Sequence, residues 1–162
     1  MSELDQLKKD IQWLKDLEDI KTLKARYIRT MILSQWDEME QLLTEDIEAS
    51  YSDGVYAFSG RKDLMQFLKD MHDSMGADNL SYWLVGLPEI NLTSATTATG
   101  TWAMHSYNLN KPMNLTQEQF AYYYDEYIKV DGAWKICMTS YKRVLEEMHD
   151  RNGLTGYQLT VG

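Results

Sequence analysis

Cysteine is almost absent from this chain of 162 residues, which contains Cys137 alone. A lone cysteine excludes an internal disulfide framework and fits a protein that works in a reducing compartment. Cys137 falls in a predicted strand, and cysteine is often buried in folded proteins. We therefore expect a small core residue at this position rather than a nucleophile.

Long hydrophobic runs are also missing. No apolar segment reaches the roughly 18 residues that a membrane-spanning helix needs, and the charged N-terminal segment does not resemble a signal peptide. These absences predict a cytoplasmic protein without a membrane partner.

Basic residues are few relative to acidic ones. The chain has 16 Lys and Arg against 25 Asp and Glu, which gives a formal net charge of −9. This balance argues against nucleic acid or an anionic membrane as a partner, because phosphate binding needs clustered cations. Hydrophobic residues at 44% and charged residues at 25% are ordinary for a globular protein. The length predicts one domain, residues 1–162, with a substantial core.

Several motifs that bind ligands or activate nucleophiles are absent as well. The three histidines lack metal-ligand spacing such as H-x-x-x-H, and no glycine-rich phosphate loop occurs. The serine elbow G-x-S-x-G is also missing. We therefore expect no metal and no cofactor, which leaves acid–base chemistry or simple binding of a small molecule.

The strongest positive signal is an aromatic hairpin in the last third of the chain. Two strand-like runs, residues 119–130 and 133–144, flank Asp131-Gly132. A type I′ turn needs positive φ at both central residues, and Asp-Gly supplies it. Tyrosine and arginine occur together on these strands, and each polar tip needs a partner if it is buried. The hairpin is therefore predicted to form the wall of a pocket that contains polar groups.

Apolar residues at helical spacing predict three helices, at residues 4–31, 36–43 and 62–75. Ser2 is a suitable N-cap for the first. That helix starts with four apolar residues at heptad spacing: Leu4, Leu7, Ile11 and Leu14. The stripe fits a contact with a second subunit as well as packing of the helix on its own sheet, and both alternatives stay open.

The remaining segments are β-prone. Residues 47–51 and 55–58 flank an Asp-Gly pair, and residues 80–92 and 93–108 precede the aromatic hairpin. Segregated helices and hairpin-connected strands predict an α+β domain, with the helices closing one face of a curved, mostly antiparallel sheet. Residues 147–162 are predicted to be a flexible tail.

Six short segments follow one another at a distinctive spacing: KARYIR (24–29), WDE (36–38), SYSDG (50–54), PEI (88–90), TTATGTW (96–102) and YKR (141–143). Together they resemble the SnoaL-like branch of the nuclear transport factor 2-like superfamily. Within it the chain is most similar to the cofactor-independent dehydratases, the bile acid 7α-dehydratase and scytalone dehydratase families. The resemblance covers about residues 15–146. It implies an α+β cone whose curved sheet wraps around a long N-terminal helix and encloses a deep pocket.

The resemblance assigns pocket positions residue by residue. The family's helix tyrosine corresponds to Tyr27, its strand tyrosines to Tyr51 and Tyr123, and its strand arginine to Arg143.

Three positions depart from the family pattern. Ile32 stands in place of an aspartate, Gly86 in place of a histidine and Ser106 in place of a second aspartate. The family's acid–base pair is therefore absent from its usual positions, and the same dehydration by the same residues is not expected.

Among the three histidines, His105 is the predicted catalytic one. It adjoins the family pocket position at Ser106, and imidazole suits proton transfer near neutral pH. The alternative is a hydrogen-bonded histidine in the pocket wall. Strand alternation turns His105 outward if Ser106 points inward, unless a bulge intervenes. His72 and His149 are expected to be exposed surface residues.

Tyr27 and Arg143 complete the predicted catalytic set. Tyr27 could donate a hydrogen bond to a leaving hydroxyl or an enolate oxygen, or it could be a core residue. Arg143 could bind a carboxylate or stabilise an oxyanion, and an ion pair with Asp125 or Glu126 is the alternative.

The predicted substrate-binding residues supply aromatic walls and polar tips: Tyr51, Trp83, Trp102, Ser106, Tyr123, Asp125 and Tyr141. Asp125 is also an alternative base, because it lies two residues after Tyr123 on the same strand.

These residues favour a cofactor-independent lyase that acts by acid–base catalysis on a hydrophobic, oxygenated aromatic or steroid-like molecule. The reaction would be a dehydratase-like elimination or a related carbon–carbon cleavage. An isomerase or polyketide cyclase of the same fold is an alternative, and so is a non-catalytic protein that binds a small molecule. Exposed sheet surface in such cones is often covered by another subunit, so the resemblance implies a homo-oligomer, a trimer or a dimer.

Overall fold

The computed structural model describes residues 2–76, 79–153, 158 and 160. In chain order the elements are α1 (Glu3–Ile32), α2 (Trp36–Leu42), β1 (Leu43–Tyr51), η1 (Ser52–Gly54), β2 (Tyr56–Ser59), α3 (Arg61–Met75), β3 (Asn79–Leu92), β4 (Thr97–Asn110), β5 (Leu115–Val130) and β6 (Ala133–Asp150). The three helices, the hairpin at the first Asp-Gly pair and the long strands are those predicted from the sequence. The α+β prediction is therefore confirmed.

A capping box starts α1. The Ser2 hydroxyl accepts from the Asp5 backbone N–H at 3.1 Å, and the Asp5 carboxylate accepts from the Ser2 N–H. Two of the orphan N–H groups at the helix start are thereby satisfied. The helix ends at Ile32, and Ser34 in the turn that follows has a positive φ of 54°. Ser2 was correctly predicted as the N-cap.

The six strands form one sheet in the order β2-β1-β6-β5-β4-β3. All pairs are antiparallel except β1 with β6. The β5–β6 hairpin turns at Asp131 and Gly132, whose φ angles are 51° and 81°. Positive φ at both residues is the requirement that the Asp-Gly pair was predicted to meet.

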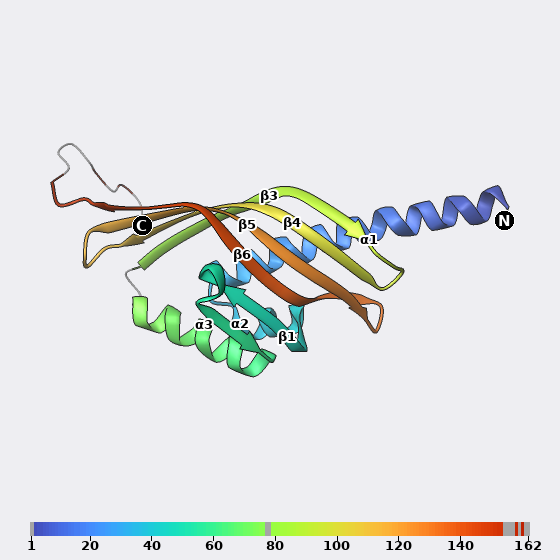
Figure 1. The fold of residues 1–162 in the computed structure, drawn as a ribbon, viewed down its shortest axis with the longest axis horizontal. Helices are drawn as coiled ribbons and strands as arrows, with labels where there is room; N and C mark the ends of the chain where they lie inside the picture. The colour runs from blue at the N-terminus through green and yellow to red at the C-terminus, as the bar shows by residue number, and fades with distance from the viewer. Residues whose placement is uncertain (1, 77–78, 154–157, 159, 161–162) are drawn as a thin grey trace.

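All three helices lie on the same side of the sheet (Figure 1), and α1 runs lengthwise along it before continuing past its end. Strand alternation sends every second side chain toward the helices. On β5, Ala121, Tyr123 and Tyr127 are buried, whereas Tyr122 and Tyr124 between them are exposed. The inner face, α1 and α3 therefore enclose the core and any internal cavity.

One helix position fixes α1 against the sheet near its middle. Asp16 is only 5% exposed, and its carboxylate accepts from Lys129 Nζ at 2.5 Å and Trp134 Nε1 at 3.0 Å. Both partners belong to the β5–β6 hairpin. From Asp16 onward α1 has a buried face, which includes Ile20, Leu23 and Tyr27.

The prediction of a tail over residues 147–162 is wrong at its start. Strand β6 continues to Asp150, because Leu115 to Phe120 of β5 pair with residues 145–150. Backbone pairing outweighs the acidic side chains there, which lie on an exposed edge of the hairpin. Residues 154–157, 159, 161 and 162 lie outside the described part of the chain.

Cys137, predicted to be a core residue, is partly rather than fully buried. No helix in the described part of the chain is long and apolar enough to cross a bilayer.

Candidate functional site

A cavity of about 190 Å³ lies between α1, α3 and the inner face of the sheet. Six predicted site residues are among those that line it: Tyr27, Tyr51, Trp83, Ser106, Tyr123 and Tyr141. Methionines and other apolar side chains from α1 and α3 form the opposite wall, with Met31, Phe67, Leu68, Met71 and Met75. The cavity therefore has one aromatic, hydroxyl-bearing side and one flexible, apolar side.

Tyr27 and Tyr51 form a hydroxyl pair inside the cavity. Their phenol oxygens are 2.9 Å apart, and the two residues are 0% and 6% exposed. Burial raises the pKa of both phenols above the ordinary tyrosine value. Both phenols are therefore protonated at neutral pH, so the pair has a proton available for a hydrogen bond to a guest in the cavity.

Tyr141 forms the neighbouring part of the cavity wall. Its ring stacks on Tyr51 with centroids 5.7 Å apart, and it meets Tyr123 edge-on at the same distance. The Tyr141 hydroxyl lies 2.9 Å from Ser52 Oγ, at the start of η1. These contacts fix three rings from β1, β5 and β6 around one space.

Ser106 provides an unused polar group in the same wall. The residue is 1% exposed and lines the cavity, yet its Oγ has no hydrogen-bond partner in the described part of the chain. Leaving a buried hydroxyl unpaired costs roughly 1–3 kcal/mol. A bound molecule with an oxygen at this point would remove that cost, so Ser106 is a candidate polar contact for a ligand.

Beneath the tyrosines lies an ion pair that is closed off from solvent. Lys24 Nζ is 2.7 Å from Asp125 Oδ2, and the two side chains are 1% and 0% exposed. The ammonium also lies 3.5 Å from the centroid of the Tyr123 ring and 4.9 Å from that of Tyr27. Burial lowers the pKa of Lys24, while the Asp125 carboxylate opposes that shift. The Lys24 ammonium therefore packs against the rings of Tyr27 and Tyr123.

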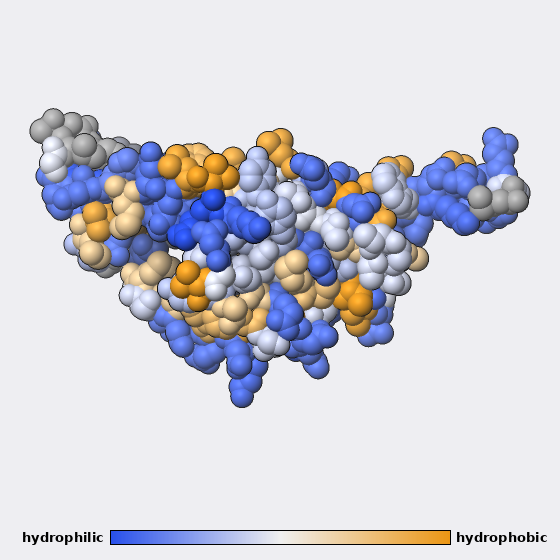
Figure 2. Space-filling model, in the orientation of Figure 1, coloured by the Kyte–Doolittle hydropathy of each residue, from blue (hydrophilic) through white to orange (hydrophobic). Residues whose placement is uncertain are grey.

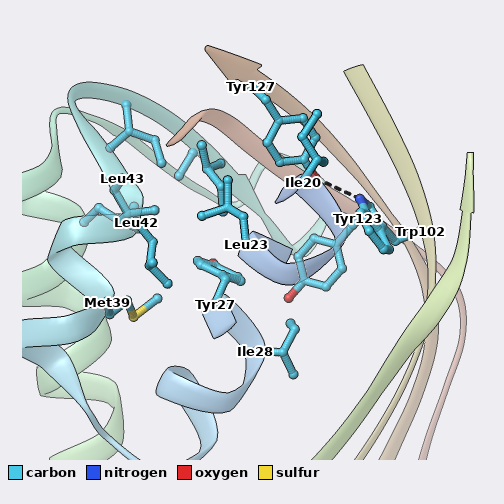
Figure 3. Close-up of a cluster of buried hydrophobic side chains, with 14 of the residues drawn as sticks. Ile20, Leu23, Tyr27, Ile28, Met39, Leu42, Leu43, Trp102, Tyr123 and Tyr127 are labelled. Atoms are coloured by element: carbon cyan, nitrogen blue, oxygen red, sulfur yellow. Dashed lines mark hydrogen bonds between the residues drawn. The ribbon is translucent and has the colours of Figure 1, made fainter. Parts of the chain in front are cut away.

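Hydrogen bonds satisfy the rest of the Asp125 carboxylate. The Thr139 hydroxyl and the Tyr127 hydroxyl each donate to it at 2.7 Å. Trp102 Nε1 in turn donates to the Tyr127 hydroxyl at 2.8 Å, the bond drawn in Figure 3. Figure 3 also shows Tyr27 on α1 near Tyr123 on the sheet, and both residues line the cavity. The network spans β4, β5 and β6, so it fixes Asp125 and, through it, Lys24.

A smaller recess of about 90 Å³ adjoins the cavity and contains His72. The recess and the cavity share five lining residues: Met31, Leu68, Met71, Met75 and Trp83. The His72 ring packs edge-on against Trp36 with centroids 5.7 Å apart, and its nitrogens lie 3.1 Å from Ser34 Oγ. His72 was predicted to be an exposed surface residue. That prediction is wrong, because the turn after α1 covers one side of the ring.

His105 does not reach the cavity, so its predicted place in the pocket wall is wrong. Its side chain is 42% exposed, bonds to Glu118 at 3.0 Å and stacks on Phe120. Ser106 points inward, and no register shift occurs between the β4 and β5 residues around it. Strand alternation therefore places His105 on the outer face of the sheet, as expected when Ser106 points inward, and the alternative of a histidine in the pocket wall is wrong as well.

Arg143 lies outside the cavity lining as well. Its guanidinium binds Asp53 at 2.8 Å and Glu146 at 3.4 Å, so the predicted partners Asp125 and Glu126 are wrong. The arginine lowers the pKa of the Asp53 carboxyl through hydrogen bonds. Asp53 directly follows Ser52, and Arg143 lies two residues after Tyr141. Ser52 and Tyr141 line the cavity, so the Asp53–Arg143 ion pair lies beside the cavity rather than in it.

Two other predicted binding residues are buried behind the wall. Trp102 lines a different groove, between α1 and β3, and its Nε1 donates to the Tyr127 hydroxyl. Asp125 forms the buried ion pair with Lys24. Lys24 was not among the site residues predicted from the sequence. A signal was present, because Lys24 lies four residues after Ile20 and four before Ile28, within the apolar stripe of the first helix.

A larger groove of about 450 Å³ runs between α1 and β3. Its rim includes Tyr82 and Leu84, which are 67% and 62% exposed. Buried polar groups suited to orient a ligand are concentrated instead in the tyrosine cavity, which we take as the candidate site. Residues 2–76, 79–153, 158 and 160 contain no group of three or more His, Cys, Asp or Glu side chains suited to hold a metal ion.

Comparison with known proteins agrees with this architecture. A family model described as a SnoaL-like domain matches residues 12–140. A "Putative Scytalone Dehydratase" from Novosphingobium aromaticivorans superposes with a TM-score of 0.76 at 18% identity, over 93% of each chain. Hexachlorocyclohexane dehydrochlorinase LinA-type3 from Novosphingobium barchaimii gives 0.77 at 16% identity, over 93% of this chain and 99% of the other. A nuclear transport factor 2-like protein with a cystatin-like fold from Novosphingobium aromaticivorans gives 0.76 at 18% identity, over 89% and 92%.

Proposed function

Because the chain belongs to the SnoaL-like domain family, we propose that its tyrosine cavity is the active site of a cofactor-independent lyase. The substrate would be a neutral, hydrophobic, oxygenated ring compound. The observation that carries the proposal is the pair of buried phenols, Tyr27 and Tyr51, beside the unpartnered hydroxyl of Ser106. These three hydroxyl groups line one cavity, together with apolar side chains and further hydroxyl and amide groups.

The cavity wall favours a neutral guest. Within the described residues its lining contains hydroxyl, amide and apolar side chains and no charged one. A carboxylate or phosphate placed there would lose its hydration without gaining a cation, which is costly. Asn108, Gln117 and Gln119 at one end can bond to further hydroxyl or carbonyl oxygens of the guest.

The volume favours a compact ring system. Small-molecule pockets typically measure about 300–1,000 Å³, and this cavity measures about 190 Å³. The adjoining recess of about 90 Å³ extends it past Trp83 and the methionines. An aromatic or bicyclic alcohol therefore fits this space better than a full steroid skeleton does.

Tyr27 and Tyr51 would act on the oxygen of the substrate. Their raised pKa values keep them protonated, so they donate hydrogen bonds to an oxygen that gains negative charge. A donor placed where charge develops in the transition state, in a site shielded from water, is a major source of rate enhancement. The nearby Asp125 carboxylate, which is paired with Lys24, adds to the effect of burial and raises the pKa of both phenols further.

His72 is our candidate for the proton acceptor. It occupies the recess that shares five lining residues with the cavity, and imidazole suits proton transfer near neutral pH. In an elimination, an imidazole nitrogen takes a proton from carbon as a carbon–carbon double bond forms. The adjacent carbon–oxygen bond breaks, and the departing hydroxyl takes a proton from the Tyr27–Tyr51 pair and leaves as water. The imidazolium then returns its proton to the pair.

A panel of ring alcohols tests the proposal. Each compound is incubated with the protein and its mass is followed, alongside the same compound carrying an added carboxylate. The account predicts that a neutral member loses water and that its carboxylated counterpart neither binds nor reacts. Tight binding without any change of mass across the panel would instead support a non-catalytic binding protein. A product of unchanged mass would indicate an isomerase or cyclase.

A further inference from the structure

The first half of α1 projects beyond the rest of the domain. Every described residue before Asp16 is exposed, and burial starts at the carboxylate of Asp16. Figure 1 shows this end of the helix extending beyond the sheet, and Figure 2 shows its visible side to be mostly hydrophilic. An isolated helical segment of this length is marginal in water, so a partner that covers it would be stabilising.

A hydrophobic stripe runs along the projecting segment. Leu4, Leu7, Ile11 and Leu14 are 59%, 55%, 50% and 56% exposed. Their spacing of three and four residues is the a and d pattern of a coiled coil, with Leu4 and Ile11 at a and Leu7 and Leu14 at d. Four large, exposed apolar side chains on one face of a projecting helix form a surface suited to pack against a partner.

The flanking charges identify what completes it. In this register the g positions are Glu3 and Asp10, and the e positions are Lys8 and Lys15. In a parallel pair of helices, each g residue meets the e residue five positions further along the partner. Glu3 would then face the partner's Lys8, and Asp10 would face the partner's Lys15. Both contacts join opposite charges.

We propose that the segment from Glu3 to Lys15 forms a short parallel coiled coil with the same segment of a second copy of this chain. An antiparallel arrangement would bring g to g and e to e, which joins acid to acid and lysine to lysine. The charge pattern therefore selects the parallel orientation. An Ile at a with Leu at d favours two strands rather than three or four, which points to a dimer through this contact.

The position of the stripe also leaves the active site free. Tyr27 lies three turns further along α1 than Asp16, inside the domain. Two copies joined by their projecting helices would hold their cavities apart, each with its own set of residues. This contact is independent of the proposed chemistry.

Disulfide trapping tests the contact directly on the full chain. Leu7→Cys is made in a Cys137→Ser background, so that the introduced thiol is alone, and the protein is oxidised at micromolar concentration. In a parallel pair the two d residues face each other, so a covalent dimer is expected. Lys9→Cys, on the opposite side of the same helix at position f, is the matched control and should give at least tenfold less dimer.

Charge exchange tests the pairing itself. Lys8→Glu with Lys15→Glu in the Leu7→Cys chain should slow trapping at least tenfold at low salt, because every g–e contact becomes acidic. Adding Glu3→Lys and Asp10→Lys reverses both members and should restore the original rate. Circular dichroism verifies that the helix content is unchanged. Trapping of Leu7→Cys no faster than that of Lys9→Cys, or trapping insensitive to the charge changes, would overturn the proposal.

Discussion

The Lys24 ammonium and the Asp125 carboxylate lie 2.7 Å apart with essentially no exposure to solvent. Burying two charges is costly, and the attraction between them offsets that cost only when the remaining bonding capacity is also used. Thr139 and Tyr127 fill the carboxylate side, and the rings of Tyr27 and Tyr123 flank the ammonium. The pair therefore joins α1 to β5 behind the cavity tyrosines, Tyr27 and Tyr123.

Removing one member of this pair should be strongly destabilising. Lys24→Met leaves the Asp125 carboxylate buried without a counter-charge, and a loss of about 3–5 kcal/mol in the free energy of unfolding is expected. Urea denaturation measures it. The double variant Lys24→Met with Asp125→Asn removes the orphaned charge and should recover part of the loss. A single variant as stable as the parent, or a double variant weaker than the single one, would contradict this interpretation.

Gly100 should tolerate no side chain. A Cβ at this position would lie 2.9 Å from Trp102 Nε1 and 3.0 Å from Tyr127 Cε2. Those two side chains carry the hydrogen bond that leads to Asp125, so Gly100→Ala must displace one of them. Overpacking of this kind costs about 1–3 kcal/mol. Gly86→Ala in β3, where an added Cβ would meet no atom within 4 Å, provides the matched control. Unfolding by urea with tryptophan fluorescence should show the loss for Gly100→Ala alone.

Asp16 should give the fold a dependence on acid pH. Burial by itself raises the pKa of Asp16, but hydrogen bonds from Lys129, Trp134 and Gln12 outweigh it and lower the pKa below 3.8. The unfolded chain then takes up the proton first as the pH falls. The stabilisation is present in full above pH 3.8 and is lost as the pH drops through the lower pKa of the folded state.

Asp16→Asn should remove that dependence. We expect the variant to be less stable than the parent by about 1.5–3 kcal/mol near pH 6, the usual contribution of a hydrogen bond to a charged group. The difference should narrow below pH 3.8, where Asp16 takes up a proton in the unfolded parent before it does so in the folded parent. Stability curves measured in urea at several pH values test this. A constant difference across the acid range would show that Asp16 contributes by packing alone.

Ser106→Ala should separate stability from ligand binding. The substitution removes a buried hydroxyl without a partner, so the free protein should be as stable as the parent or up to about 1 kcal/mol more stable. The same substitution should weaken binding of an oxygenated ligand, because one polar contact is lost. Thermal denaturation with and without ligand measures both effects. A destabilised free protein would show that Ser106 has a structural partner.

Most of the fold followed from local patterns in the sequence. The heptads and the capping serine predicted α1, and two Asp-Gly pairs predicted the hairpins at Asp53 and Asp131. These signals are short-range, because a turn type or a helix start depends on a few neighbouring residues. The extent of β6 was missed because pairing with β5 continues through an acidic segment that has no strand-like pattern of its own.

The site was predicted less completely, for reasons of three-dimensional placement. Strand alternation could have excluded His105 once Ser106 was taken to point inward. The contact of His72 with Ser34 joins residues 38 positions apart, and no local pattern announces it. The partner of Arg143 proved to be Asp53, 90 residues away. Lys24 was visible in the helical stripe, but its partner Asp125 is fixed only by the tertiary packing of α1 on β5.

The two histidines provide a direct contrast for the chemistry. His72→Gln should lower turnover strongly, at least a hundredfold for a general base, with stability close to that of the parent. His105→Gln should leave turnover within about twofold, because that ring lies on the outer face with Glu118 and Phe120. Equal effects of the two substitutions would remove His72 from the mechanism.

The central claim is that the Tyr27–Tyr51 hydroxyl pair acts on the oxygen of a neutral ring alcohol. The most direct measurement is turnover by Tyr27→Phe on the best substrate from the alcohol panel, with binding of that substrate measured in parallel. The account predicts a fall in kcat of at least a hundredfold with an intact fold and a dissociation constant changed by no more than about tenfold. A Tyr27→Phe variant that turns over at the parental rate would contradict it.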